Sequence, residues 1–412
     1  MQIFDYIKAR WGDVDAWLPG DESEICDIRL ASMWTAIAKI TGANAEPPWT
    51  LEVHSPRALP AVLHLDGRRH LIWDAGLSTF LTNLAFPLRY PDPQPGPVVE
   101  AILRRTIAVR FLLAGQVTEA ASHVHYADRL LKETPIDRFH QDNADIESRF
   151  EVWLMTEMQE RFVLAHELVH YLRSVDPEAF ERCSSEITKT AKDLFRCTEP
   201  TGSVLSRRLY HSDHNSLSAR DLDPYAWYLR IRQKTSKRPT RKSWVSRVRE
   251  TTTALSSSSS LNEEIICDLI ASLAVGLDAH HRQNGWSAMM GVSCCRLALT
   301  NLATLTGIDS WVSGNQKSVS VVQPEILVRG RCLDVLLPFM LPKILKEHGG
   351  NCSLRSEDIQ EVMLLVEMMN EEVLTPAFAA IDHLPKPPEG PVLTYEETLL
   401  LAGFIYFPPR AS

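Results

Sequence analysis

The spacing of apolar side chains predicts helices over most of this chain. Apolar residues recur every three to four positions from Ile3 to Ile7 and again from Leu30 to Ile37, which is the period of an amphipathic helix. We therefore expect residues 1–46 to form an N-terminal helical segment. Pro47 and Pro48 end this segment, because proline disfavours helical backbone at the residue before it.

After the two prolines the pattern becomes that of strands. Trp49–His54 and Ala61–Leu65 are short runs rich in aromatic, β-branched and leucine side chains. Asp66 and Gly67 follow, and Asp-Gly is a strong signal for a two-residue hairpin turn, so we expect Arg68–Asp74 to be the returning strand. A small sheet inside a mostly helical chain predicts the α+β fold class.

Helical patterning then dominates the rest of the chain. Amphipathic stretches cover residues 98–131 and 146–174, and an apolar stretch covers 261–281. From 287 to 407 the pattern is again mostly helical, with a short strand expected at 319–322.

The segment 198–260 differs from its surroundings. It contains nine Lys or Arg between Arg230 and Arg249, followed by five consecutive Ser at 256–260. A segment so polar gains little from packing, which predicts a long, partly mobile insertion. We interpret its basic run as a solvated loop, with contact to an acidic partner as the alternative.

These patterns divide the chain into three parts. An N-terminal helical segment covers residues 1–46. A core covers 47–285 and is interrupted by the insertion at 198–260. A C-terminal helical region covers 286–412.

Composition narrows the function classes. The chain is 45% hydrophobic and 23% charged, as in an ordinary globular protein. Its formal charge of −9 argues against nucleic-acid binding, because that role usually needs a basic face. The N-terminus lacks the basic and then apolar run of a secretory signal, and no apolar stretch reaches the roughly 18 residues that span a membrane.

The eight cysteines are scattered, and no pair has the Cys-x-x-Cys spacing of a zinc site. Cys294 and Cys295 lie in an apolar helical stretch, and we interpret them as buried core. Scattered cysteines of this kind predict a reduced, cytoplasmic chain. The lack of a long apolar stretch predicts that the chain does not enter a membrane.

The sequence His-Glu-Leu-Val-His at 166–170 carries the chemistry. On a helix, His166 and His170 lie on one face within about 6 Å of each other, where they can share one zinc ion. Glu167 is displaced around the helix toward the open coordination position, so it can act as a general base on a water that the metal activates. Apolar residues flank the motif and can anchor a buried helix: Met155, Met158, Phe162, Leu168 and Leu172.

A second helical stretch offers the third ligand. Ser260 and Glu263 have the spacing of a capping box, which assigns Glu263 to the helix start and leaves Glu264 free. Asp268 lies four residues after Glu264 and therefore on the same helical face. Carboxylates in so apolar a helix need strong partners, which a metal ion and the outer nitrogen of a ligand histidine would supply. The alternative is a pair of exposed helix charges.

His-Glu-x-x-His followed by a helix with Glu-x-x-x-Asp resembles the gluzincins, the thermolysin-like clan of zinc peptidases. The resemblance implies His166, His170 and Glu264 as zinc ligands, Glu167 as general base, and Asp268 behind a ligand histidine. It covers only those two helices. The Glu-Glu-x-x-x-Asp form is also similar to that of the Lit-type phage-exclusion peptidases.

Metzincins do not fit, because Arg173 and Asp176 stand where that class has glycine and histidine. The gluzincin resemblance implies a zincin-like core, in which the hairpin at 49–74 provides the sheet edge that binds substrate as an added strand. A peptidase also needs residues that stabilise the transition state. We consider His280, His281 and Tyr228, and also Tyr225 and the stretch 211–214, with a structural role as the alternative for each.

We therefore expect a zinc-dependent endopeptidase that cleaves a selective intracellular protein target, in regulation or phage defence. An activating partner is expected to act through 198–260 or the C-terminal region. The alternative is a regulatory or defence sensor module whose zinc site is structural or degenerate. A third interpretation, a nucleic-acid binder using 230–249, would show binding that depends steeply on salt.

Overall fold

The structure is a computed structural model, and it describes most of the chain between residues 15 and 382. The described residues are 15–17, 24–54, 60–65, 68–89, 96–133, 146–198, 241–257, 260–282, 285–319, 324–349 and 374–382, with scattered positions between 354 and 398. Over these residues the fold is mostly helical with one small sheet, which confirms the α+β class in its broad sense.

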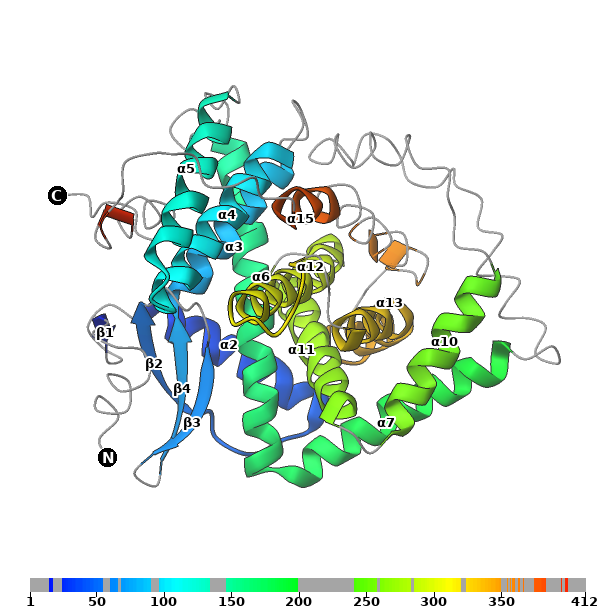
Figure 1. Ribbon diagram of the computed structural model, residues 1–412. Coiled ribbons are helices and arrows are strands. Elements are labelled where there is room, and N and C mark those ends of the chain that lie inside the picture. The colour runs from blue at the N-terminus through cyan, green and yellow to red at the C-terminus, as the bar shows by residue number, and fades with distance from the viewer. Residues whose placement is uncertain are drawn as a thin grey trace.

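Four strands form the sheet, in the order β1-β2-β4-β3 (Figure 1). β3 and β4 pair antiparallel as the predicted hairpin, whereas β2 and β4 run parallel. β4 is a central strand, and its three consecutive apolar residues at 71–73 are all buried because both of its faces are covered. The strand bounds are Asp15–Trp17 (β1), Trp49–His54 (β2), Ala61–Leu65 (β3) and Arg68–Asp74 (β4).

The expectation of helix throughout 1–46 is wrong at β1. Asp15–Trp17 pairs antiparallel with β2, with Asp15 opposite His54. The spacing of apolar residues could not predict this pairing, because the strand that pairs with Asp15–Trp17 lies some forty residues later in the sequence. Among the described residues, α2 is the first helix.

The helices have the bounds Glu24–Thr41 (α2), Ala75–Arg89 (α3), Gly96–Leu113 (α4), Val117–Glu133 (α5), Ile146–Val175 (α6), Pro177–Thr198 (α7), Arg241–Ser256 (α10), Ser260–Arg282 (α11), Gly285–Val312 (α12), Pro324–Ile344 (α13) and Thr375–Asp382 (α15). A π-helical turn, η4, covers Leu345–Gly349 directly after α13.

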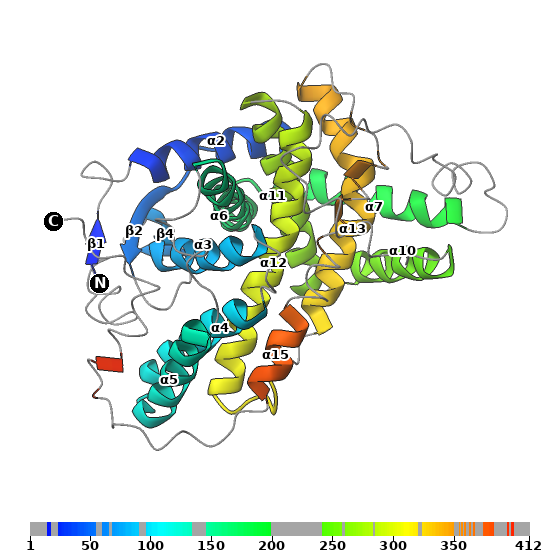
Figure 2. The same cartoon turned by 90° about the horizontal axis from the view of Figure 1, so that it is seen from above.

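α6 and α11 lie side by side at the centre of the molecule (Figures 1 and 2). They run antiparallel, since Arg161 on α6 contacts Asp278 late on α11, whereas His166 contacts Asp268 earlier on α11. α2 and α3 pack on α6 beside the sheet, and α12 and α13 pack on α11 from the other side. The two helices that carry the motifs are therefore held in place by four neighbouring helices, α2, α3, α12 and α13.

A buried ion network fixes this central pair to α2. Glu157 on α6 accepts from Arg161 at 2.8 Å and also pairs with Arg29 of α2. Arg161 in turn contacts Asp278 of α11 at 3.2 Å and the Ser32 hydroxyl of α2 at 2.6 Å. Because these groups are buried, breaking one pair would leave an unpaired charge in the core, so the network holds three helices in one register.

One hydrophobic core runs from Leu30 on α2 to Ile381 on α15. All three predicted parts of the chain contribute to it, so they share one packing unit. Cys294 and Cys295 are buried in it as free thiols, as expected. α12 is the one described helix long and apolar enough to cross a membrane, and 78% of its apolar window, within Ser287–Val312, is buried by the fold.

The predicted loop character of the insertion is wrong over Arg241–Ser256. These residues form α10, which packs against α7 and α13 (Figure 1). Val248, Thr251 and Leu255, at helical spacing, are buried despite the basic residues around them. Residues 199–240 lie outside the described part of the chain.

The strand expected at 319–322 does not form at Val319, which lies in a turn after α12. The Asp382 carboxylate accepts the Val319 backbone N–H at 2.8 Å, so that donor is satisfied without a neighbouring strand. Residues 320–322 lie outside the described residues.

Candidate metal centre

Both histidines of the motif lie on α6, and their Nε2 atoms meet 3.1 Å apart. The spacing of four residues places the two rings one turn apart, with centroids separated by 4.8 Å. The remaining faces of this turn are anchored in the core by apolar residues: Leu164, Ala165, Leu168, Val169 and Leu172. The helix therefore cannot rotate to move either ring away.

Glu264, in the first turns of α11, completes a triangle with the two rings. Its Oε2 lies 3.4 Å from His166 Nε2, and its Oε1 lies 3.3 Å from His170 Nε2. Bonds of about 2.05 Å at tetrahedral angles place two zinc ligand atoms about 3.3 Å apart. The three donors could thus hold a metal ion, and their spacing is compatible with zinc; they are the one such group among the described residues.

Asp268 holds the outer nitrogen of His166. Its Oδ1 lies 2.9 Å from His166 Nδ1, and the carboxylate has no exposed surface. Such a contact fixes the ring so that Nε2 faces the cluster, and it makes the imidazole more basic. Burial alone would lower the pKa of His166, but Asp268 and Glu264 raise it to about 9. A metal ion at this site would therefore displace a proton.

Arg329 of α13 is a part of the site that sequence reasoning missed. Its Nε and one terminal nitrogen donate to the two Asp268 oxygens at 2.7 and 2.8 Å, and its other terminal nitrogen lies 3.0 Å from Glu264 Oε2. The sequence signal for Arg329 was weak: it is one of several charged residues among the apolar residues of 326–335. This pattern does not indicate which acidic residue Arg329 pairs with.

The cations around Glu264 keep it ionised. Burial would raise the pKa of Glu264, but contacts with His166, His170 and Arg329 hold it well below its usual range. An ionised carboxylate is the form that binds a metal ion.

Glu167 is partly buried on the next position of α6. Burial raises the pKa of this carboxyl, and the neighbouring His166 and His170 oppose the rise. A carboxylate with a raised pKa is a better proton acceptor near neutral pH than an exposed one.

Glu263 lies in the first turn of α11, the helix start expected from sequence, and it also contacts α6. Its Oε1 lies 3.4 Å from His170 Nδ1 and forms an ion pair with Arg173 of α6. The Cys267 thiol also approaches His170 Nδ1, at 3.7 Å.

The structure does not bring His280 and His281 to the cluster. They lie sixteen and seventeen residues after Glu264 on the same helix, roughly 24 Å away at 1.5 Å per residue. Their Nε2 atoms bond instead to the backbone carbonyls of Gly349 and His348 in η4. The other residues considered for transition-state stabilisation, Tyr228, Tyr225 and the stretch 211–214, lie outside the described residues.

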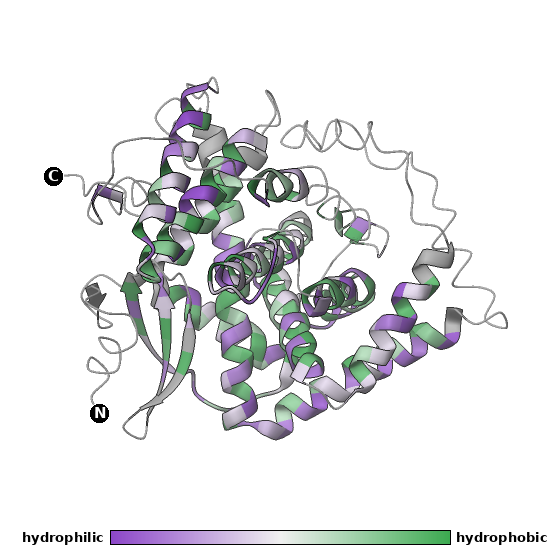
Figure 3. Ribbon diagram, in the orientation of Figure 1, coloured by the Kyte–Doolittle hydropathy of each residue, from purple (hydrophilic) through white to green (hydrophobic). Residues whose placement is uncertain are grey.

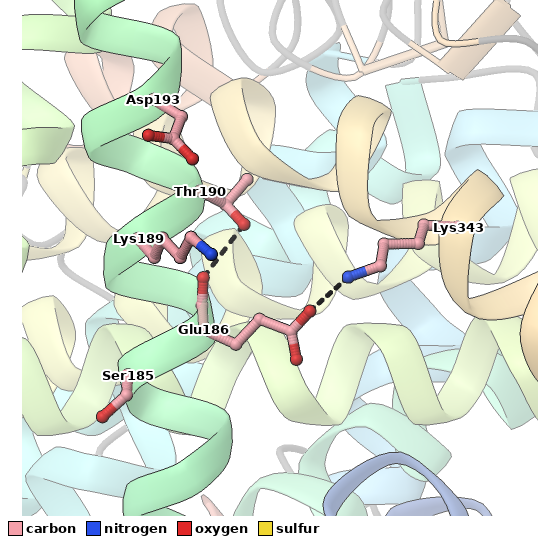
Figure 4. A pocket seen from close by; sticks show the side chains of 6 residues that line it. All are labelled: Ser185, Glu186, Lys189, Thr190, Asp193 and Lys343. Atoms are coloured by element: carbon pink, nitrogen blue, oxygen red, sulfur yellow. Dashed lines mark hydrogen bonds and ion pairs between the residues drawn. The ribbon is translucent and has the colours of Figure 1, made fainter.

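A shallow cavity of about 460 Å³ lies elsewhere, between α7 and α13 (Figure 4). Glu186 pairs there with Lys343. Its lining includes none of the cluster residues and has balanced charges: Ser185, Glu186, Lys189, Thr190, Asp193 and Lys343. It gives no reason to place the chemistry away from α6 and α11.

Comparison of this chain with family models, with curated proteins and with solved structures finds no match. The assignment of the site therefore rests on its own geometry.

Proposed function

We propose that this protein is a zinc-dependent endopeptidase of the gluzincin kind. One observation carries the proposal: two imidazole nitrogens and one carboxylate converge at zinc-ligand spacing, with Glu167 next to them on the same helix. A structural zinc site is usually closed by four protein ligands, whereas a catalytic site keeps one position open. Among the described residues three donors meet, which favours the catalytic alternative.

In this proposal His166, His170 and Glu264 would hold the ion. When bound, zinc would lower the pKa of a water molecule and polarise the scissile carbonyl. Glu167, which follows His166 directly on α6, would be the residue that accepts a proton from the attacking water and returns it to the leaving amine. Asp268 and Arg329 keep His166 and Glu264 in place during the reaction.

The substrate would bind along the sheet. β3 forms one edge of the sheet and packs next to α6. An extended peptide can add to such an edge through main-chain hydrogen bonds, which would carry its scissile bond toward α6. We propose a protein or peptide substrate in the cytoplasm, and activation by a partner that contacts 198–260 or the C-terminal region.

Glu167→Gln tests the proposal. The variant should fold and bind one equivalent of zinc like the wild type, because neither ligand nor core is changed. Peptide hydrolysis should fall by at least 10²–10⁴-fold, the usual contribution of a general base. Zinc content is measured on protein purified without chelator, and targets are sought by comparing the proteomes of cells that express either form.

His166→Ala provides the control, since it should lose both zinc and activity. Wild-type protein without metal would overturn the proposal. Wild-type protein that binds zinc but cleaves no peptide or cellular target would instead support the alternative of a sensor with a structural zinc site, and a Glu167→Gln variant that cleaves as fast as the wild type would show that Glu167 is not the general base.

A further inference from the structure

The two candidate ligand histidines are supported in parallel ways. Behind His166 stands Asp268, which is held by Arg329. Behind His170 stands Glu263, which is held by Arg173. Each imidazole thus faces a carboxylate on α11, and each carboxylate is paired with an arginine. Only the first of these arrangements is implied by the resemblance to gluzincins.

We propose that Glu263 is a positioning residue that orients His170 for metal binding, and that Arg173 acts through Glu263. This inference rests on the proposed zinc site. A carboxylate facing Nδ1 selects the tautomer that leaves the Nε2 lone pair free for a metal. His170 depends on such a carboxylate more than His166 does, because less of its ring is held by packing. The exposed fraction of the side chain is 26% for His170 and 10% for His166.

The two arrangements differ in strength. The Glu263 contact is 3.4 Å and its side chain is 26% exposed, whereas the Asp268 contact is 2.9 Å and fully buried. Water screens a charge interaction more as exposure rises. Loss of Glu263 should therefore weaken zinc binding less than loss of Asp268.

Glu263 also connects the metal cluster to the helices that flank α6 and α11 in the chain. Arg173 lies in the last turn of α6, and Glu263 lies in the first turn of α11. α7 follows α6 in the chain, and α10 precedes α11. α7 and α10 pack along each other and form an arm (Figure 1). The Arg173–Glu263 pair closes the base of this arm, so the same carboxylate that orients His170 also joins the two ends of the arm.

Zinc affinity, measured by competition with a chromophoric chelator, tests the proposal. Glu263→Ala should weaken zinc binding roughly tenfold, at the low end of the range for such partners. Glu263→Gln, which keeps an oxygen acceptor without its charge, should lie between Glu263→Ala and the wild type. Asp268→Asn should cost more than either.

Arg173→Ala gives a second readout. It should weaken zinc binding in the wild type but have no further effect in the Glu263→Ala background, because it acts only through that carboxylate. Glu186→Ala is the matched control: it also breaks an ion pair between a glutamate and a cation, Lys343, and this pair touches no candidate ligand (Figure 4). Its zinc affinity should equal that of the wild type.

Two outcomes would overturn the inference and leave the proposed function standing. Glu263→Ala could lower the melting temperature while zinc affinity stays within twofold of the wild type, as expected of a helix-start residue. Alternatively, Cys267→Ser and not Glu263→Ala could weaken binding, which would make the thiol the partner of His170. Wild-type protein that binds no zinc would overturn the proposed function itself.

Discussion

Asp268 carries a negative charge at a position without solvent contact, and Arg329 balances it with two hydrogen bonds. Arg329 also lowers the pKa of Asp268, against the raising effect of burial. A buried ion pair adds little net stability compared with apolar residues, but removing one partner leaves an uncompensated charge. The pair is therefore sensitive to single substitutions.

We expect Arg329→Met to lower the free energy of unfolding of the zinc-free protein by about 3–5 kcal/mol. Urea denaturation measures this change. The double variant Arg329→Met with Asp268→Asn should recover part of the loss, because the neutral amide needs no cation. Equal losses in the single and the double variant would show that Arg329 stabilises the fold by packing alone.

Gly330, next to Arg329, is required for close packing. A Cβ there would lie 2.5 Å from Arg296 Cζ, and the buried Arg296 guanidinium is held by Asp334 at 3.3 Å and Thr300 at 3.0 Å. We expect Gly330→Ala to destabilise the protein by about 1–3 kcal/mol, the range for overpacking. Thermal or urea unfolding measures the change.

Gly307 is the matched control, because it is also a buried glycine within a helix. A Cβ at Gly307 would lie 3.8 Å from its nearest neighbour, the Val319 carbonyl oxygen, which is ordinary contact. Gly307→Ala should be neutral or stabilise by about 0.5–1 kcal/mol, as alanine costs less backbone entropy in a helix. If both variants destabilise equally, the contact with Arg296 is not the cause.

At the scale of single residues, the sequence predicted those site residues that lie close together in the sequence on one helix. His166 and His170 follow from a spacing of four on a helix, and the structure brings Glu264 and Asp268 to them. Arg329 was missed because it lies 61 residues from Asp268, and no period in the sequence connects them. The capping box placed Glu263 at the helix start, where the structure has it, but no local rule could give its contacts with His170 and Arg173 on another helix.

Among the elements, α10 differs most from its sequence-based interpretation. Its basic residues suggested a solvated loop, yet every third or fourth position is apolar or small and turns toward α7 and α13. α7 has a matching character, with polar residues along its outer side (Figure 3) and buried ones at Phe180, Cys183 and Ile187. The composition of a segment counts the residues on every face of a helix, whereas packing against the core depends on one face only. A basic composition therefore did not exclude a packed helix.

Hydrogen exchange tests this assignment. Backbone amides from Val248 to Leu255 should exchange slowly in the free protein, because they are helical and lie over a buried face. Amides at Ser256 and Ser257, at the end of the helix, should exchange faster. Rapid exchange through the whole of α10 would restore the interpretation as a mobile loop.

On the scale of the whole molecule, segments far apart in the sequence share one core, and charged or titratable groups are buried in it. His123 on α5 is an example: it is 3% exposed and packs between Phe111 and Trp311. Burial, with a smaller effect from Arg104, lowers its pKa to about 3. The folded protein thus keeps this ring neutral at pH values where the unfolded chain protonates it.

The contribution of His123 to the stability of the protein should therefore fall as pH decreases below about 6.5. His123 binds a proton in the unfolded chain from this pH downward, but in the folded protein only near pH 3. At pH 5 the difference corresponds to about 2 kcal/mol. His123→Phe, which keeps an aromatic ring between the same neighbours, should lose less stability than the wild type between pH 7.5 and pH 5 by that amount. Parallel pH profiles of urea unfolding for the two proteins would contradict this prediction.

The distance along the chain between the two halves of the site has a consequence for biosynthesis. Arg173 leaves the ribosome 90 residues before Glu263, and at about 5–20 residues per second this interval lasts roughly 5 to 20 s. During this interval the nascent chain lacks Glu264, so His166 and His170 cannot yet be part of the three-donor cluster. In the proposed metal site, the preference for one ion over another therefore arises only once α11 has been synthesised and has packed on α6.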